Sequence, residues 1–373
     1  MTLFIGMMSG TSVDAIDAAV VDFSGTHPKL IAAHQQNHTP ELRQQLLALG
    51  QPGENEINRM MAADHQLGHA LADAALAVLK KANIAATSVT AIGSHGQTIR
   101  HLPHLASTLQ IGDPNIIAER TGIATVSDFR RRDMAQGGQG APFAPLFHQQ
   151  VFSSDVEDRA VINIGGIANI SILPKSSSQK IIGFDTGPGN CLMDEWVKDH
   201  LQIDYDKDGV WAASGCAHPL FLAELLKDSY FTLPPPKSSG REYFNRQWLH
   251  QKMTAFSLDL KPEDVQATLL ELTAHSIHQS ILQYAPTIKA AFICGGGALN
   301  LYLMRRLREL GAIRYQVFST EQLGIHPCWA EAMLFAWLAK QRVEEIPCQL
   351  QTITGTQGSG AILGGLYLSA MKL

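Results

Sequence analysis

The sequence predicts an α/β protein with two domains. Three observations support this fold class. Short apolar segments that end at glycine alternate with long amphipathic segments, a glycine-tipped hairpin lies in each half, and 373 residues are enough for two hydrophobic cores. Apolar residues make up 45% of the chain and charged residues only 17%, so we expect large buried cores.

Charge and cysteine content narrow the possible partners and location. The 29 Lys and Arg nearly balance the 34 Asp and Glu, which argues against a nucleic-acid or membrane-surface binder and favours a small-molecule partner. The five cysteines are scattered and never form CxxC, so neither a disulfide framework nor a zinc site is indicated. With no secretory leader pattern and no apolar run of about 18 residues, we expect a cytoplasmic protein.

In the first half, the pattern predicts a hairpin, a long helix and a further strand. The hairpin has a buried strand at residues 3–6, a turn of small residues at 7–12 and a return strand at 14–22. Helical spacing of apolar residues predicts a helix over residues 54–81. A strand at 89–93 then delivers Ser94, His95 and Gln97 at its C-terminal end, where open α/β sheets usually bind ligands.

A domain boundary is predicted near residue 129. Residues 128–140 contain the basic sequence FRRRD followed by QGGQG, a polar and flexible composition that suits a crossover between domains. The small, apolar C-terminus is expected to pack back onto the first domain. We therefore assign residues 1–129 and about 346–373 to the first domain and residues 130–345 to the second.

The second half begins as the first does. Residues 160–164 and 167–173 read as two strands around the Gly165-Gly166 turn, which suggests a weak internal repeat. A strand at 181–184 ends in the sequence DTGPGN at 185–190, and a helix follows at 191–200. Residues 234–240, PPPKSSG, read as an exposed loop. Further elements are predicted at 262–284 (helix), 290–294 (strand) and 329–342 (helix).

Several familiar motifs point elsewhere but are weak. The GxxxxGK[ST] loop is absent, and the GPG of residues 187–189 lacks the rest of a dinucleotide fingerprint. Asp185-Thr186-Gly187 is the tripeptide of aspartic proteases, yet no second copy exists in the chain. The pairs His101/His104 and His275/His278 have no HExxH context, so we favour ordinary histidines over metal ligands.

Four glycine turns at strand ends carry the main functional prediction. They lie at residues 6–12, 165–166, 187–190 and 295–297. Glycine allows main-chain amides to approach phosphate closely, and consecutive amides form anion-binding concavities. Together with Asp14 and Asp185, they predict a nucleotide cleft between two related halves.

Seven stretches, in order along the chain, resemble the motifs of the anhydro-N-acetylmuramic acid kinase family. They are GMMSGTSVDAIDAA (6–19), GSHGQT (93–98), FRRRDMAQGGQGAP (129–142), NIGGIANI (163–170), GFDTGPGN (183–190), ICGGGALN (293–300) and HPCWAEAMLFAWLA (326–339). The resemblance implies the two-domain actin-like ATPase fold shared by hexokinase, actin and related ATPases. It also implies a bacterial cytosolic enzyme of peptidoglycan recycling, often a dimer.

Site residues follow from the resemblance. It implies that Asp185 is the catalytic base and that ATP is bound by Gly10, Thr11, Ser12, Val13, Asp14, Ala15, Ile16, Asp17, Gly165, Gly166, Gly187, Gly189, Asn190, Gly295, Gly296 and Gly297. Candidates for the anhydro amino sugar are Ser94, His95, Gln97, Arg130 and Glu331, with Arg130 or a neighbouring arginine on the lactyl carboxylate. Magnesium is expected on the phosphates, with Asp14 as a partner through water.

Two alternatives remain open at this stage. An ordinary hexose or acetylhexosamine kinase would use Asp185 to deprotonate a free hydroxyl. A nucleotide-gated binding protein of the same fold would bind ATP without forming a phosphorylated sugar.

Overall fold

The computed structural model describes residues 2–10, 13–175, 179–241, 243–256 and 260–370. The chain forms two compact units. The first comprises Met1–Val151 and Trp329–Leu373, and the second comprises Phe152–Cys328. This division differs from the predicted boundaries near residues 129 and 345, because residues 130–151 and 329–345 pack with the first unit.

The first unit is built on a six-stranded sheet with the order β13-β7-β4-β1-β2-β3. Its strands are β1 (Leu3–Ser9), β2 (Ala15–Asp22), β3 (Lys29–Asn37), β4 (Val89–Ser94), β7 (Thr125–Ser127) and β13 (Gly365–Tyr367). A separate hairpin pairs β5 (Gln97–Leu102) with β6 (Ser107–Ile111). The helices are α1 (Pro40–Leu49), α2 (Glu56–Ala82), α3 (Pro114–Thr121), α4 (Arg130–Ala135), α5 (Ala144–Phe152) and α13 (Ala330–Val343).

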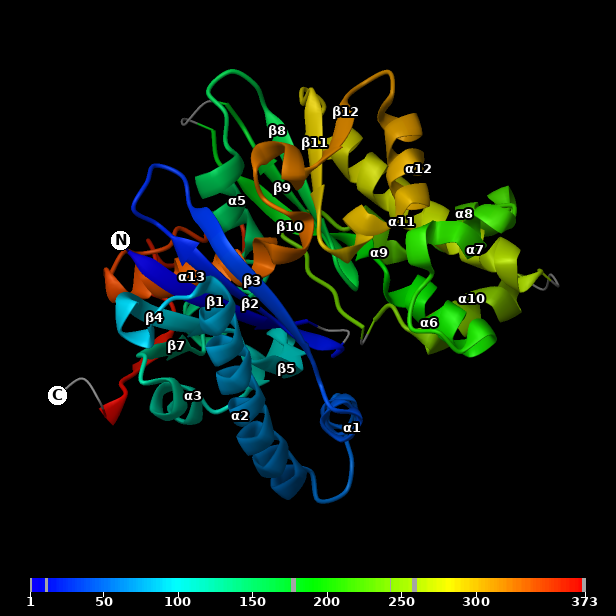
Figure 1. Ribbon diagram of the computed structural model, residues 1–373. Coiled ribbons are helices and arrows are strands. Elements are labelled where there is room, and N and C mark those ends of the chain that lie inside the picture. Colours follow the sequence, from blue (N-terminus) through cyan, green and yellow to red (C-terminus); the bar gives the residue numbers. More distant parts are fainter. Residues whose placement is uncertain (1, 11–12, 176–178, 242, 257–259, 371–373) are drawn as a thin grey trace. The chain divides into compact units, whose positions relative to one another are not determined.

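Two helices cover opposite faces of this sheet (Figure 1). Alternate residues of β1, such as Ile5 and Met7, share a hydrophobic cluster with Leu71 on α2. The opposite face of β1 carries Gly6, where a Cβ would overlap the carbonyl of Ala332 on α13. Because side chains alternate along a strand, glycine lets α13 lie directly against the sheet.

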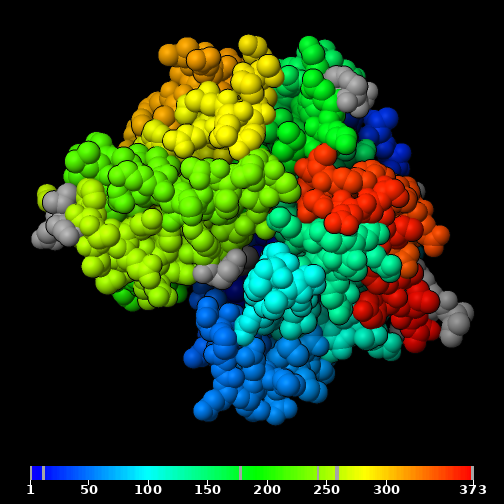
Figure 2. All heavy atoms as spheres, turned by 180° about the vertical axis from the view of Figure 1, so that it is seen from behind, coloured from blue at the N-terminus to red at the C-terminus, as the bar shows by residue number. Residues whose placement is uncertain are grey.

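The C-terminal residues return to the first unit, as predicted. β13 pairs antiparallel with β7, and the amide of Gln139 donates to the carbonyl of Thr354 at 2.9 Å. Figure 2 shows this segment, in red, against the teal surface formed by residues of the middle of the first unit.

The second unit is built on a five-stranded sheet with the order β10-β9-β8-β11-β12. Its strands are β8 (Arg159–Ile164), β9 (Ile167–Leu173), β10 (Ile182–Pro188), β11 (Ala290–Cys294) and β12 (Gln316–Ser319). The helices are α6 (Cys191–Leu201), α7 (Val210–Ser214), α8 (Pro219–Leu226), α9 (Ser229–Thr232), α10 (Arg246–Phe256), α11 (Pro262–Tyr284) and α12 (Leu301–Gly311). Buried residues of α11 form much of the core, including Leu269, Leu272 and Ile277.

Both sheets share one topology. In each, the first strand lies centrally, two antiparallel strands follow on one side, and two parallel strands lie on the other; the first sheet adds β13 as an antiparallel edge strand beyond β7. The antiparallel neighbours are β2 and β3 in one unit and β9 and β10 in the other. This repeated order confirms the predicted two-domain α/β fold with related halves.

Three local predictions were wrong. Met7–Ser9 belongs to β1 instead of the turn, and Asp185–Pro188 belongs to β10 instead of following it. The segment 128–140 is a short helix and a loop held in the first unit, because the Asp133 carboxylate is buried and accepts hydrogen bonds from the Gly140 amide and the Thr354 hydroxyl, both at 2.7 Å. These buried bonds fix a segment whose composition suggested a flexible crossover.

None of the helices in the described part of the chain combines the length and the apolar character needed to cross a bilayer.

Candidate active site

The predicted first phosphate loop joins β1 to β2. The amide of Val13 donates to the carbonyl of Gly10 at 3.0 Å, which closes a tight turn in which Val13 has a φ of 55°. Thr11 and Ser12 lie outside the described residues. Ala15, Ile16 and Asp17 belong to β2, so the loop itself is shorter than the predicted stretch from Gly10 to Asp17.

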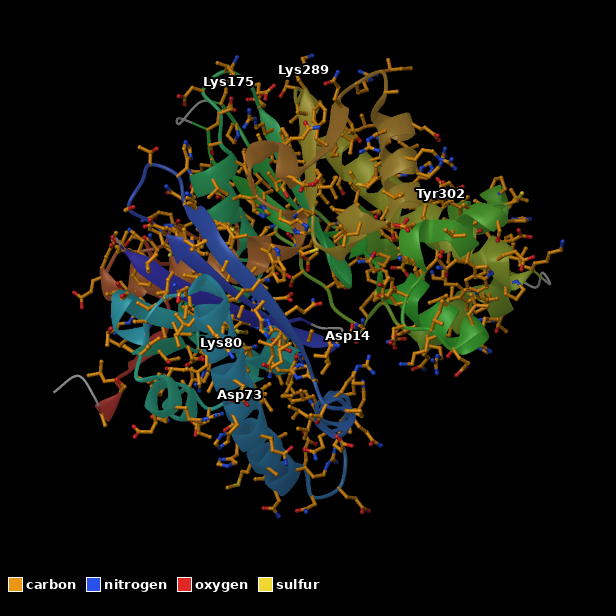
Figure 3. All side chains as sticks on the ribbon, viewed as in Figure 1. Asp14, Asp73, Lys80, Lys175, Lys289 and Tyr302 are labelled. Atoms are coloured by element: carbon orange, nitrogen blue, oxygen red, sulfur yellow. The ribbon has the colours of Figure 1, made fainter. Side chains whose placement is uncertain are left out.

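Two carboxylates stand near this hairpin in different surroundings. Asp14, labelled in Figure 3, has a side chain that is 51% exposed, and its Oδ1 accepts bonds from Nη2 and Nε of Arg43 at 2.7 and 3.1 Å. Burial raises the pKa of Asp17 to about 6, opposed by a hydrogen bond from Gln35 at 3.0 Å. The charge of Asp14 is thus at the surface and screened by solvent, whereas ionisation of Asp17 in the folded protein is opposed by burial.

The predicted sugar-binding group after β4 forms an internal network. His95 is buried, its Nδ1 bonds the Gly96 carbonyl at 3.0 Å, and its Nε2 accepts from Nε of Arg130 at 3.1 Å. Burial, followed by the charge of Arg130, holds the pKa of His95 well below its usual value and keeps the imidazole neutral. Because Nε2 accepts from Arg130 and Nδ1 faces a carbonyl, the proton is assigned to Nδ1. His95 therefore positions Arg130.

Gln97 and Ser94 differ in what their side chains bind. Gln97 is 2% exposed; its Oε1 accepts from the Ser9 hydroxyl at 2.6 Å, and its Nε2 donates to the Thr98 carbonyl at 3.3 Å. The Ser94 hydroxyl is buried and has no hydrogen-bond partner among the described residues. Of these two, Ser94 retains a donor and an acceptor for a ligand.

Arg130 begins α4 and is held from several sides. Its Nη1 donates to the Gly140 carbonyl at 2.7 Å, and its guanidinium lies 5.3 Å from the centre of the Phe143 ring. On α13, Glu331 is partly buried and lies one turn before Phe335, whose ring contacts His95 with a centroid separation of 4.8 Å. The first unit thus gathers Ser94, His95, Arg130 and Glu331 in one region.

In the second unit, the two predicted glycine turns contact each other. The amides of Gly189 and Asn190 donate to the carbonyls of Gly166 and Gly165 at 2.9 and 2.8 Å. A Cβ at Gly189 would overlap the Gly165 carbonyl. Glycine is required for this close approach, but the amides of Gly189 and Asn190 are already satisfied and do not form an open amide cradle.

The third glycine segment joins the same end of β8. Gly295 has a φ of 79° and donates its amide to the Pro327 carbonyl at 3.0 Å. A Cβ on Gly295 or Gly297 would overlap Ile164, the last residue of β8, while Gly296 begins a short 3-10 helix, Gly296–Leu299. The glycine turns at 165–166, 189–190 and 295–297 therefore meet at the carboxyl end of β8, whereas Gly187 lies in β10 opposite Ala168 of β9.

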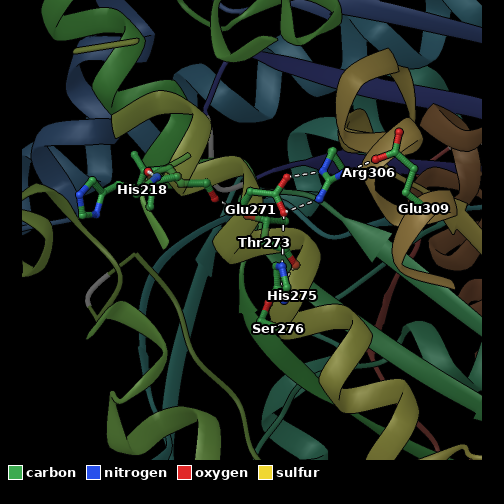
Figure 4. A network of polar contacts seen from close by, with 9 residues as sticks. His218, Glu271, Thr273, His275, Ser276, Arg306 and Glu309 are labelled. Carbon is green, nitrogen blue, oxygen red and sulfur yellow. Dashed lines mark hydrogen bonds and ion pairs between the residues drawn. The ribbon is translucent and has the colours of Figure 1, made fainter. Parts of the chain in front are cut away.

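Helix α11 is hydrogen-bonded to the turn at residues 187–190. The hydroxyl of Thr273 donates to the carbonyls of Pro188 and Gly189 at 3.1 and 2.8 Å. Figure 4 shows Thr273 next to Glu271, whose carboxylate pairs with Arg306 of α12. The DTGPGN segment is therefore fixed to a helix that is itself tied to its neighbour.

Asp185 is the predicted site residue of this unit that carries a charge. It is 7% exposed and precedes an irregularity in the pairing of β10 with β9 between Asp185 and Gly187. Its Oδ2 accepts from the Ser239 amide at 2.9 Å, and its own amide donates to the Lys237 carbonyl at 3.0 Å. Hydrogen bonds to the ionised form favour a carboxylate over a carboxylic acid.

The family model of anhydro-N-acetylmuramic acid kinase matches residues 2–369 of this chain. The chain belongs to this family. It is 50% identical over 366 residues to the anhydro-N-acetylmuramic acid kinase of Shewanella oneidensis, with 98% of each chain covered. It is 49% identical to that of Coxiella burnetii, covering 98% of this chain and 97% of the relative.

Solved structures give a weaker comparison. A ROK family glucokinase from Streptomyces griseus, in complex with glucose and AMPPNP, matches with a TM-score of 0.42 and 14% identity, covering 91% of this chain and 99% of that chain. At this TM-score the similarity supports no conclusion about this member of the anhydro-N-acetylmuramic acid kinase family.

Sequence reasoning missed the loop that encloses Asp185. Residues 234–240 were expected to be exposed, yet Lys237 is 7% exposed and Ser239 donates its amide to the carboxylate. The hydroxyl of Tyr230 donates to the Asp185 carbonyl at 2.9 Å. The sequence did not indicate that this loop encloses Asp185, because a segment rich in proline, serine and glycine is typical of solvated loops.

Proposed function

We propose that this chain is an ATP-dependent phosphotransferase that opens 1,6-anhydro-N-acetylmuramic acid with water and phosphorylates O6. The products are N-acetylmuramic acid 6-phosphate and ADP, as part of peptidoglycan recycling. Membership of the anhydro-N-acetylmuramic acid kinase family supports the substrate. The buried, hydrogen-bonded Asp185 is the observation that carries the mechanism.

The anhydro bridge determines what the base must do. O6 is bonded to C1, so the substrate has no free hydroxyl at this position to phosphorylate. Asp185 takes a proton from water, the water oxygen forms a bond to C1, and the C1–O6 bond breaks. O6 then bonds to the γ-phosphorus as ADP leaves, so one carboxylate serves both hydrolysis and phosphoryl transfer.

The first unit supplies groups for the sugar. Arg130 binds the lactyl carboxylate through its planar guanidinium, and the bonds to His95 and Gly140 hold it in place. Ser94 and Glu331 bind hydroxyl or amide groups. Gln97 supports Ser9 from behind, because both ends of its amide are occupied within the protein.

ATP is assigned to the glycine turns of both units. The turn that begins at Gly10 and ends at Asp14 holds phosphate, and Ala15, Ile16 and Asp17 extend from it into β2. The turns at Gly165-Gly166, Gly187-Pro188-Gly189-Asn190 and Gly295-Gly296-Gly297 shape the remainder of the nucleotide site. In the second unit glycine acts mainly by removing side-chain bulk, since the amides of Gly189 and Asn190 already have carbonyl partners.

Magnesium fits if nucleotide phosphates and water provide most of its ligands. Within the described ranges, no group of three or more His, Cys, Asp or Glu side chains could hold a metal by itself. Asp14 is half exposed, and Arg43 occupies its Oδ1, which leaves Oδ2 to act through water. When bound, the ion would neutralise charge on the transferred phosphoryl group.

A coupled assay for ADP release tests the function. We expect turnover with anhydro-N-acetylmuramic acid and little with a panel of free hexoses. ADP release with free hexoses alone would assign an ordinary sugar kinase, and ATP binding without any phosphorylated sugar would reject an enzyme. We also propose a cytoplasmic homodimer, which sedimentation analysis and cell fractionation would test.

A further inference from the structure

A closed set of hydrogen bonds surrounds Asp185 on the side of the 234–240 loop. The Asp185 amide donates to the Lys237 carbonyl at 3.0 Å, and the Lys237 ammonium donates to the Tyr230 carbonyl at 3.1 Å. The Tyr230 hydroxyl returns to the Asp185 carbonyl at 2.9 Å. Lys237 is therefore linked to both main-chain groups of Asp185, directly to the amide and through Tyr230 to the carbonyl.

Lys237 itself is a buried cation. It is 7% exposed, and its Nζ lies 4.7 Å from the centre of the Tyr230 ring and 5.8 Å from that of Phe184. Burial lowers the pKa of Lys237 to about 8, and the charge of Asp185 opposes that shift. A buried ammonium is stabilised by hydrogen-bond acceptors and by nearby negative charge; the Tyr230 carbonyl is such an acceptor, and the negative charge of Asp185 acts in the same sense.

We propose that Lys237 is a positioning residue for the reaction, which holds Asp185 in place and keeps its carboxylate ionised so that it can accept a proton from water. This inference rests on the proposed function. A cation near a carboxylate favours the ionised form, and the surrounding aromatic rings exclude water that would otherwise screen the attraction.

A second ion pair lies beside this cluster. Asp228 begins α9 beside Tyr230 and pairs with Lys252 at 3.1 Å. Asp228 also accepts from the Tyr243 hydroxyl at 2.6 Å and the Trp248 indole at 2.9 Å. Lys252 is therefore engaged with Asp228, whereas the charge of Lys237 acts on Asp185.

The test compares two lysines of the same unit. Lys237→Met should lower kcat about 10- to 100-fold, leave the KM for both substrates within about threefold, and move the acid limb of the kcat profile to higher pH. The limb moves upward because an unpaired Asp185 is protonated more readily. Lys237→Arg should recover most of the kcat and the original limb.

Lys252→Met is the matched control, since Lys252 also lies over an aromatic ring, 5.6 Å from the centre of Trp248, but pairs with Asp228. It should leave the acid limb unchanged. Tyr230→Phe keeps the ring but removes the hydroxyl bond to Asp185, so kcat should fall with no movement of the limb. The two variants separate fixation of the main chain from the effect of charge.

Each outcome decides the matter. An acid limb that stays in place in Lys237→Met, with a kcat close to that of Lys252→Met, would overturn the proposal while leaving the function intact. If the methionine variant does not fold, Lys237→Gln removes the charge but keeps a donor, and its acid limb gives the same decision. Failure of the unchanged protein to phosphorylate the anhydro sugar would instead reject the proposed function.

Discussion

The two units share a sheet topology but hold their carboxylates in opposite ways, one in the third strand, β10, and the other between the first two strands, β1 and β2. In the second unit, Asp185 is 7% exposed, and a main-chain amide donates to its Oδ2 at 2.9 Å. In the first unit, Asp14 is 51% exposed and paired with Arg43. Two units with the same sheet topology therefore differ in how deeply they bury a carboxylate. We expect the loss of the more buried charge to have the larger effect on the protein.

Asp185→Asn should give the largest effect on turnover. Asparagine keeps the size of the side chain but is unable to accept the proton of water, so kcat should fall by about 10²–10⁴-fold. ATP affinity, measured by calorimetry, should be retained. Reaction of the unchanged protein in ¹⁸O-water should place label at C1, since the attacking oxygen comes from solvent. Near-normal turnover by the variant would remove Asp185 as the base, and unlabelled C1, after correction for exchange, would reject attack by water.

Arg130→Ala should follow. If Arg130 binds the lactyl carboxylate, loss of its charge-assisted hydrogen bonds should weaken binding of the anhydro sugar by about 1.5–3 kcal/mol. The comparison substrate is the analogue without the lactyl group, on which the loss should be small. Equal losses on both would assign Arg130 to a structural role through His95 and Gly140.

Much of the fold could be predicted from the sequence because its pattern is local. Apolar periodicity located α2 and α11, which begin and end close to the predicted residues. The glycine tips located both hairpins, since glycine is needed where backbones approach closely.

The parts that resisted prediction depend on contacts between distant residues. Asp133 is fixed by Thr354, more than two hundred residues further along the chain, and this bond turns an apparently flexible segment into an ordered one. The residues on either side of Lys237 in the sequence have the composition of a solvated loop. Its burial results from packing beside Tyr230, which the local sequence does not show. Local pattern carries no information about such partners.

Asp17→Asn should change the pH dependence of stability. The pKa of Asp17 in the folded protein is raised to about 6, so the folded state holds this proton more tightly than the unfolded state does. The stabilisation is present at low pH and is lost as pH rises from about 4 to about 6. The variant should flatten this slope and be about 1–2 kcal/mol more stable at pH 7.

Chemical denaturation at several pH values measures this effect, and Asp22→Asn on the same strand is the control. The pKa of Asp22 is lowered, chiefly by the hydrogen bond from the Ser24 amide, so its removal should change the slope in the opposite direction. A slope unaltered by Asp17→Asn would show that Asp17 ionises freely in the folded state.

Asp14→Asn should have the smallest effect on stability. An exposed pair of this kind contributes about 0–1 kcal/mol, because water and salt screen it. Asp73 is the matched control, since it pairs with Arg120 at the same 2.7 Å and its side chain is 52% exposed; Figure 3 labels both acids. Thermal unfolding should therefore shift little and equally for Asp14→Asn and Asp73→Asn.

The two variants should differ in the magnesium concentration that gives half-maximal turnover, which should rise several-fold only for Asp14→Asn. The rise is modest because one carboxylate acting through water contributes little to an ion held mainly by phosphate. An equal magnesium dependence in both variants would leave Asp14 as a surface ion pair and place the ion entirely on the nucleotide and other groups.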